Sequence, residues 1–334
     1  MVVFAAATVW PSSAHAQDHL ASIVTKAKLT REDAARIEAE VSDRARKLGE
    51  AGTNEKERTK ARDRLLGTLK TQGATKAGLD AYADACGGAL APLTASETFA
   101  VGLEAISILV ELDNPNTARA LDTGLGSPHP AARYKAARGL RLLQGKIKSD
   151  DAKCKKALES LAAAGAAERD PIVLAAIYQA MNFYPEASDF QFGADLAAAL
   201  NTLLEGRLTR LREGGLDEQQ DLPAFDLAAA CQAAAEDTDR VKLVQHLAPF
   251  LSSAARRYLD GQASDESLQT LSATVKRMEE PLYALMKASK KSPPKASLAD
   301  ALASKAAPDT KRESVRSALD ELMSALKGEP WNLG

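Results

Sequence analysis

The chain has 334 residues, of which 45% are hydrophobic and 26% are charged, so it can bury a core and is not globally disordered. Its 43 Lys and Arg nearly balance its 45 Asp and Glu, and a net charge of −2 excludes recognition of nucleic acid or anionic membrane by overall charge. Aromatic residues make up only 4%, and alanine supplies much of the apolar share, which suits many thin helix–helix contacts better than one thick core.

Residues 1–16 have the pattern of a signal peptide. An apolar run from Val2 to Trp10 is followed by a helix-breaking Pro-Ser-Ser and by the small-x-small sequence Ala14-His15-Ala16. Only Met1 precedes the run, so the basic n-region is missing, and an upstream start codon and a weak signal both stay open. We favour a signal over a buried N-terminal helix because the run is short. The mature chain is expected to begin at Gln17, to be periplasmic or secreted, and to carry no membrane span.

Residues 17–30 are expected to form an N-terminal tail, and residues 31–72 a charged helical hairpin. Thr30 to Asp33 resembles a capping box in which Asp replaces the usual Glu or Gln. Gly49 and Gly52 end the first helix, and the second ends near Gly73. The Lys and Arg residues alternate with Asp and Glu, which favours a solvated face over a nucleic-acid site.

Helical spacing continues from residue 75, whereas strand signals are almost absent. Ser96 is expected to cap a helix with Phe99, Leu103, Ile106 and Val110 on its core face. The other helices expected up to residue 288 are 117–125, 131–143, 149–165, 171–184, 190–212, 224–235, 238–259 and 264–287.

Two of these segments align with each other. Pro130 to Leu140 matches Pro171 to Met181 at an offset of 171 − 130 = 41 residues, and each follows a shorter helix and a polar turn. Proline in the first turn of a helix loses no hydrogen bond. A repeat of this length and layout is typical of stacked helical pairs. The matched apolar positions are Ala132/Val173, Ala136/Ile177 and Leu140/Met181.

The matched segments resemble the HEAT/armadillo-type helical-repeat family, whose second helices commonly open Asp-x-x-Val-Arg-x-x-Ala-x-x-x-Leu. The segment from His129 to Leu140 comes close, with Ala for the Val and with Arg133 in register, while the segment from Asp170 replaces the Arg by Leu174. The resemblance is clearest over residues 97–184. It implies a HEAT-like domain at 75–288, in which the two equivalent helices lie side by side and bury Leu140 and Met181.

The C-terminal part departs from the repeat. Residues 289–309 are rich in Lys, Ser and Pro and are expected to form a linker. Residues 310–334 are expected to form a helix, capped by Thr310, and a tail. The predicted fold is therefore an all-α, HEAT-like solenoid with an N-terminal charged helical hairpin and a C-terminal helix.

Three widely spaced cysteines leave two interpretations open. Cys86, Cys154 and Cys231 could supply one disulfide and a spare thiol, or could be small buried residues of helices. We favour the second, because free cysteines are usually buried.

The sequence contains no catalytic, cofactor-binding or metal-binding motif. His15 lies four residues before His19 but is expected to be removed with the signal peptide, and neither His129 nor His246 has a His or Cys partner three or four residues away. No phosphate-binding glycine loop or nucleophile motif occurs. The acidic pairs at 150–151 and 237–239 lie where helices begin, so we interpret them as capping residues. We predict no cofactor, no metal and no catalytic residue.

The candidate partner-binding residues are aromatic. Tyr178 and Phe183 are expected in the core, whereas Tyr134 and Tyr184 are candidates for a binding surface. Trp331 either staples the tail onto the fold or serves as a docking residue.

The role that the sequence favours is an exported, non-catalytic scaffold that binds another protein. One alternative is an all-α, lyase-like enzyme with a dispersed active site, which a pocket gathering acids, His246 and a tyrosine would favour. The other is a structural cell-envelope protein that self-associates through residues 31–72.

Overall fold

The structure is a computed structural model that describes residues 20–182, 192–214, 218–262 and 265–333. Every regular element in these ranges is a helix, which confirms the all-α class. The chain divides into two compact units, Met1–Ile147 and Lys148–Gly334, so the division falls inside the segment predicted as one repeat domain. The signal-peptide pattern at 1–16 lies outside the described residues.

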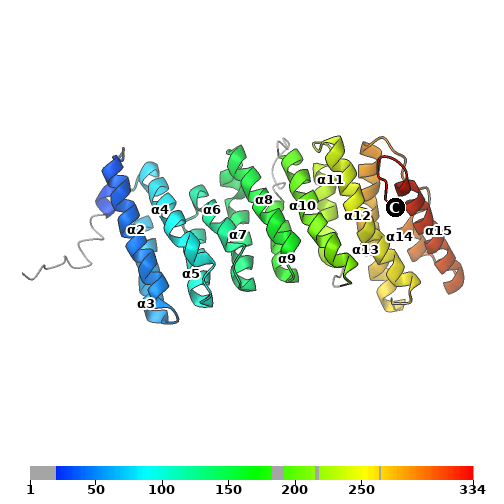
Figure 1. The fold of residues 1–334 in the computed structure, drawn as a ribbon, viewed down its shortest axis with the longest axis horizontal. Coiled ribbons are helices and arrows are strands. Elements are labelled where there is room, and N and C mark those ends of the chain that lie inside the picture. Colours follow the sequence, from blue (N-terminus) through cyan, green and yellow to red (C-terminus); the bar gives the residue numbers. More distant parts are fainter. Residues whose placement is uncertain (1–19, 183–191, 215–217, 263–264, 334) are drawn as a thin grey trace, which may run out of the picture. The chain divides into compact units, whose positions relative to one another are not determined.

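In the first unit, consecutive helices pack as hairpins (Figure 1). α2 packs on α3 and α4, α4 packs on α5 and α6, and α7 packs on both α5 and α6. The segment predicted as a charged hairpin, residues 31–72, contains α2 and α3, which pack on each other, and a short 3-10 turn. The helices are α2 (Arg31–Ala51), α3 (Glu55–Gly67), α4 (Lys76–Thr94), α5 (Phe99–Glu111), α6 (Ala118–Gly124) and α7 (Pro130–Ile147).

The start of α2 is a capping box, as predicted. The Thr30 hydroxyl accepts from the Asp33 amide at 3.1 Å, and the Asp33 carboxylate accepts from the Thr30 amide at 3.0 Å. Lys26 Nζ lies 2.6 Å from the same carboxylate. The hydrogen bond from Lys26, followed by that from the Thr30 backbone, lowers the pKa of Asp33 to about 2.

The Asp33→Asn variant is expected to lose stability only where the native carboxylate is charged. Because the pKa of Asp33 is lowered from 3.8 to about 2 on folding, its contribution is complete above pH 4 and disappears as the pH falls toward 2. Urea unfolding should give a constant wild-type-to-variant gap between pH 5 and 7 that closes by about pH 2. Glu32→Gln, at a neighbouring exposed position, is the control. An undiminished Asp33→Asn gap at pH 2 would contradict this account.

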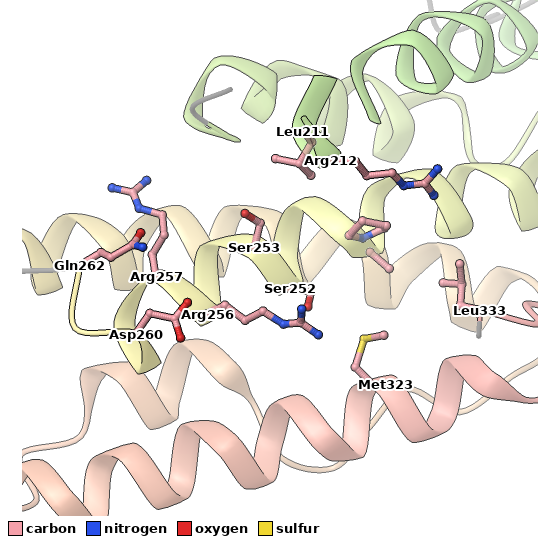
Figure 2. A pocket seen from close by; sticks show the side chains of 12 residues that line it. Leu211, Arg212, Ser252, Ser253, Arg256, Arg257, Asp260, Gln262, Met323 and Leu333 are labelled. Carbon is pink, nitrogen blue, oxygen red and sulfur yellow. The ribbon is translucent and has the colours of Figure 1, made fainter. Parts of the chain in front are cut away.

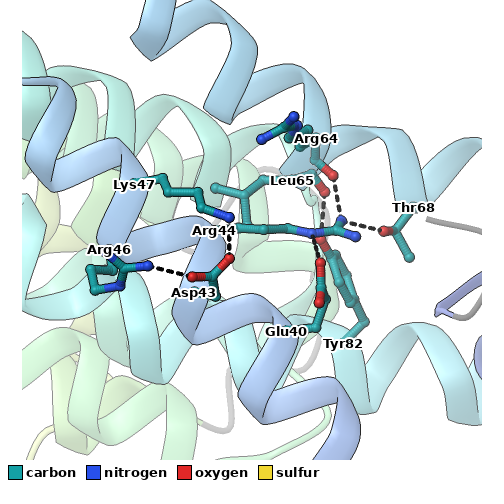
Figure 3. A network of polar contacts seen from close by, with 9 residues as sticks. All are labelled: Glu40, Asp43, Arg44, Arg46, Lys47, Arg64, Leu65, Thr68 and Tyr82. Atoms are coloured by element: carbon teal, nitrogen blue, oxygen red, sulfur yellow. Dashed lines mark hydrogen bonds and ion pairs between the residues drawn. The ribbon is translucent and has the colours of Figure 1, made fainter. Parts of the chain in front are cut away.

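A buried arginine joins the two helices of the hairpin (Figure 3). The Arg44 guanidinium donates to Glu40 Oε1 at 3.0 Å, to the Arg64 carbonyl at 2.6 Å and to Thr68 Oγ1 at 3.3 Å. Tyr82 of α4 adds a bond to the Leu65 carbonyl at 2.6 Å. Buried charge is retained at low cost when its donors are satisfied in this way. These contacts therefore fix α3 against α2 and α4.

Close backbone packing explains a glycine at the start of α4. A Cβ atom at Gly78 would lie 2.1 Å from the Val24 carbonyl oxygen, so no other residue fits without displacing the backbone. The same carbonyl accepts from the Thr75 amide at 2.9 Å. Gly78 thus allows the segment around Val24 to lie directly on α4.

In the second unit, packing again follows chain order (Figure 1). α8 packs on α9 and α10, α10 on α11 and α12, and α12 on α13 and α15. The helices are α8 (Asp151–Ala167), α9 (Pro171–Met181), α10 (Gly193–Arg212), α11 (Leu222–Cys231), α12 (Asp237–Leu259), α13 (Asp265–Ala288), α14 (Leu298–Ala303) and α15 (Pro308–Lys327).

The segment predicted as a linker, residues 289–309, is folded instead. It contains α14, which packs on α13 and buries Leu298 and Leu302. The Glu279 carboxylate of α13 accepts from the Leu298 amide at 2.7 Å and the Ser297 hydroxyl at 2.7 Å, so it caps the start of α14. The linker prediction was therefore wrong, because a short apolar helix lies within the Lys- and Pro-rich composition. Thr310 is not the cap of α15, which begins at Pro308.

The matched helices α7 and α9 begin at their prolines, as predicted. Asp170 caps α9 by accepting from the amides of Ile172 at 2.8 Å and Val173 at 3.2 Å. All six matched apolar side chains, including Leu140 and Met181, are buried. Since α7 and α9 belong to different compact units, their stacking on each other stays a prediction.

Candidate functional site

The three predicted partner-binding residues have different surroundings. Tyr134 is half-buried on α7, and the Arg138 guanidinium carbon lies 5.8 Å from the centre of its ring. Such a pair is a modest cation–π contact at a surface. Tyr184, like Phe183, lies outside the described residues.

Trp331 is not a surface anchor. Its side chain is only 1% exposed, and Gln245 of α12 donates to its backbone carbonyl at 2.6 Å. The Leu333 amide then bonds the Leu326 carbonyl at 3.0 Å and folds the tail back on α15. Of the two predicted roles, the structure matches stapling, because a buried indole is not available to a partner.

The most deeply buried charged cluster serves the core. Arg207 donates to both Asp221 oxygens, at 2.9 and 3.0 Å, and to the Glu168 carbonyl at 3.0 Å. Tyr178 donates to Asp221 Oδ1 at 2.6 Å. Burial, reinforced by the Asp221 charge, raises the pKa of Tyr178 well above its ordinary value. These three side chains are at most 1% exposed, so a substrate cannot reach them in this fold.

His246 takes part in a hydrogen-bonded contact between two helices. Its Nδ1 lies 3.2 Å from the Asn201 side-chain oxygen, and the Asn201 amide donates to the Asp239 carbonyl at 3.2 Å. Burial lowers the pKa of His246, so the neutral ring is favoured at pH 7. This contact joins α12 to α10.

All three cysteines are free thiols buried in helices, as the favoured interpretation predicted. Burial raises the pKa of each thiol to about 12. Because the thiolate is the reactive form, the native thiols should be inert at pH 8.

We therefore expect Ellman's reagent to modify none of the three cysteines rapidly in the native protein at pH 8 and all three in 6 M guanidinium. The measurement is thiol release against time in both conditions. A fast native phase, or fewer than three thiols after unfolding under non-reducing conditions, would contradict buried free cysteines.

The described part of the second unit has an open groove along α12 (Figure 2). The end of α10 borders it on one side, and α15 with the C-terminal tail borders it on the other. Its volume is about 510 Å³. The residues that line it are Leu211, Arg212, Ala248, Pro249, Ser252, Ser253, Arg256, Arg257, Asp260, Gln262, Met323 and Leu333.

The groove is elongated because its α12 residues recur every three or four positions. Ala248 and Asp260 mark the ends of this row, and twelve helical steps of 1.5 Å span roughly 18 Å. Leu333 reaches the groove only because the stapled tail places it there. Burial of Trp331 thus helps to build one wall of the groove.

The lining combines apolar side chains with arginines. Arg257 pairs with Glu218 at 2.8 Å. Arg212 and Arg256 are exposed, and neither side chain forms an ion pair or hydrogen bond with any described residue. Asp260 is the one carboxylate among the lining residues. The groove lining therefore combines apolar side chains with an excess of positive charge.

The sequence alone did not indicate this groove. Its residues come from three segments that are far apart in the chain, around Arg212, Arg256 and Leu333. The only local signal was a pair of arginines in the last turn of α12, and basic residues are common there because they favour the helix dipole.

No protein-family model matches the chain, and no curated protein matches it either. Among the described residues, no three His, Cys, Asp or Glu side chains are grouped as a metal site would require. None of the described helices combines the length and apolar character of a bilayer span. The geometry of the groove thus carries the functional argument.

Proposed function

We propose that this protein is an exported, non-catalytic scaffold of HEAT-like helical hairpins that binds another protein through the groove along α12. The shape of the groove carries the proposal. A channel of roughly 18 Å accommodates about five residues of extended chain or three turns of a helix. Arginine and methionine, both present in the groove lining, are enriched at protein–protein interfaces.

The groove lining favours binding over the enzyme alternative. Ser252 and Ser253 are its only hydroxyl side chains, and no His, Cys or Tyr is among the lining residues. A serine nucleophile needs a base within hydrogen-bonding distance. His246 is bonded to Asn201 and does not line the groove.

Export is supported by the pattern at residues 1–16, and the HEAT-like arrangement by the 41-residue match. Mass analysis of the mature protein from its native host should give an N-terminus at Gln17. An N-terminus at an intact Met1 would contradict the proposed export.

Affinity capture from the native envelope fraction tests the binding role. We would compare the wild type with Ser253→Trp, which fills the groove at a half-buried lining position, and with Thr202→Trp, at an exposed position of α10 outside the lining. We expect one protein to be captured by the wild type and the Thr202 variant and lost with the Ser253 variant. Equal capture by all three proteins, or capture of none, would contradict the proposal.

A further inference from the structure

We infer that the partner presents an acidic segment to the groove along α12. The segment carries at least two carboxylates, one on each side of an apolar residue. This inference rests on the proposed function and specifies the chemistry of the partner. It follows from the charges that line the groove and from their arrangement along it.

The charge of the groove is not balanced by the protein. Arg257 is matched by Glu218, so Arg212 and Arg256 are opposed by Asp260 alone among the lining residues. The chain as a whole carries a net charge of −2, so this local excess of positive charge is not a property of the whole surface. Guanidinium groups bind carboxylates through paired hydrogen bonds, and a basic partner would be repelled.

The two unpaired arginines lie on different walls of the groove. Arg212 projects from α10, whereas Arg256 projects from α12 toward Met323 of α15 (Figure 2). Pro249 and Leu333 supply apolar surface along the same channel. A segment that binds both arginines therefore spans a channel whose apolar side chains an apolar residue of that segment can contact.

Both arginines are exposed, so their attraction for the partner should be sensitive to salt. Charge reversal at either position should weaken the binding of an acidic ligand by more than the loss of one contact would, because it also adds repulsion. Lys276 of α13 offers a matched control, since its side chain is 67% exposed and does not line the groove.

Fluorescence anisotropy with the full-length protein tests the inference. The probe is a labelled ten-residue peptide of alternating Glu and Leu, and its analogue carries Lys at every Glu. We expect the wild type to bind the Glu peptide at least about 10-fold more tightly than the Lys peptide at low salt. Arg212→Glu and Arg256→Glu should each weaken the Glu peptide by about 10-fold or more, whereas Lys276→Glu should change it by less than about 2-fold.

Several results would overturn the inference. Equal affinity for the two peptides would show that the groove has no preference for negative charge. If Lys276→Glu weakens the Glu peptide as much as the two arginine variants do, the attraction is a general effect of the protein's charge and not of the groove. Displacement of the peptide by millimolar inorganic phosphate, dependent on both arginines, would mean that the groove recognises a small anion. If the Glu peptide fails to bind while Ser253→Trp still abolishes protein capture, the acidic segment is excluded and the scaffold role stands.

Discussion

Replacing Asp221 by alanine is expected to lower the free energy of unfolding of the second unit by about 3–5 kcal/mol. The reason is the Arg207 guanidinium, which is fully buried and makes two of its hydrogen bonds to Asp221. Without the carboxylate, a buried charge has no counter-ion, and the Tyr178 hydroxyl also loses its acceptor. Urea unfolding followed by circular dichroism gives the measurement.

Two further variants show whether the loss comes from the unpaired charge. The double variant Arg207→Met/Asp221→Leu should recover most of the stability, because it removes both charges and keeps similar volume. Arg277→Ala breaks an exposed pair, in which Arg277 and Asp226 are each 56% exposed, and should cost less than about 1 kcal/mol. If Asp221→Ala costs no more than Arg277→Ala, the buried cluster does not hold the unit together.

Helix starts were predicted correctly at some capping residues and wrongly at others: Ser96 was expected to cap α5, but the N-cap of that helix is Thr98. The caps at Thr30, Asp150 and Asp170 are all present. α4 was not delimited, because Gly87, Gly88 and Pro92 resemble helix breakers. Gly87 lies where a Cβ would be 3.3 Å from the Asn116 carbonyl, so it marks close packing and not a turn. Such a glycine cannot be distinguished from a helix end without its neighbours.

The core face of α5 was predicted correctly at Ile106, which is buried, but wrongly at Phe99. Phe99 was expected inside, but it is 44% exposed and its ring contacts His129 edge-on at 5.3 Å between centroids. The buried side chains include Val101, Ala105 and Leu109. Because α5 is apolar on nearly all sides, periodicity cannot select a face, and packing against α4 and α7 decides it.

The groove could not be predicted from the sequence because it is formed by long-range contacts. The burial of Trp331 depends on the tail docking on α12, where its carbonyl bonds Gln245, 86 residues away in the chain. The groove in turn depends on that docked tail, because Leu333 forms part of its wall. Neither the burial of Trp331 nor the groove is indicated by the residues next to it in the sequence. Trp331 could therefore be selected as a candidate because it is aromatic, but its stapling role could not be predicted.

The Leu140→Ala variant is expected to lower the free energy of unfolding of the first unit by about 2–5 kcal/mol. Leu140 is 1% exposed on α7, which packs on α5 and α6. The neighbouring backbone is tightly held, since a Cβ at Gly139 would lie 2.6 Å from a Val110 methyl group. The surroundings therefore cannot collapse readily into the cavity. Leu142→Ala is the matched control: its side chain is 62% exposed, so it should cost less than about 0.5 kcal/mol.

Hydrogen exchange on the same two variants tests the repeat itself. In an array of stacked hairpins, stability passes between adjacent repeats. If α7 and α9 are equivalent second helices, Leu140→Ala should raise exchange in α9 as well as in α5 and α6, whereas Leu142→Ala should raise it in none of them. Equal exchange of α9 in the wild type and in Leu140→Ala would contradict the repeat. The 41-residue match would then reflect only two helices that begin at a proline and bury apolar side chains at the same spacing.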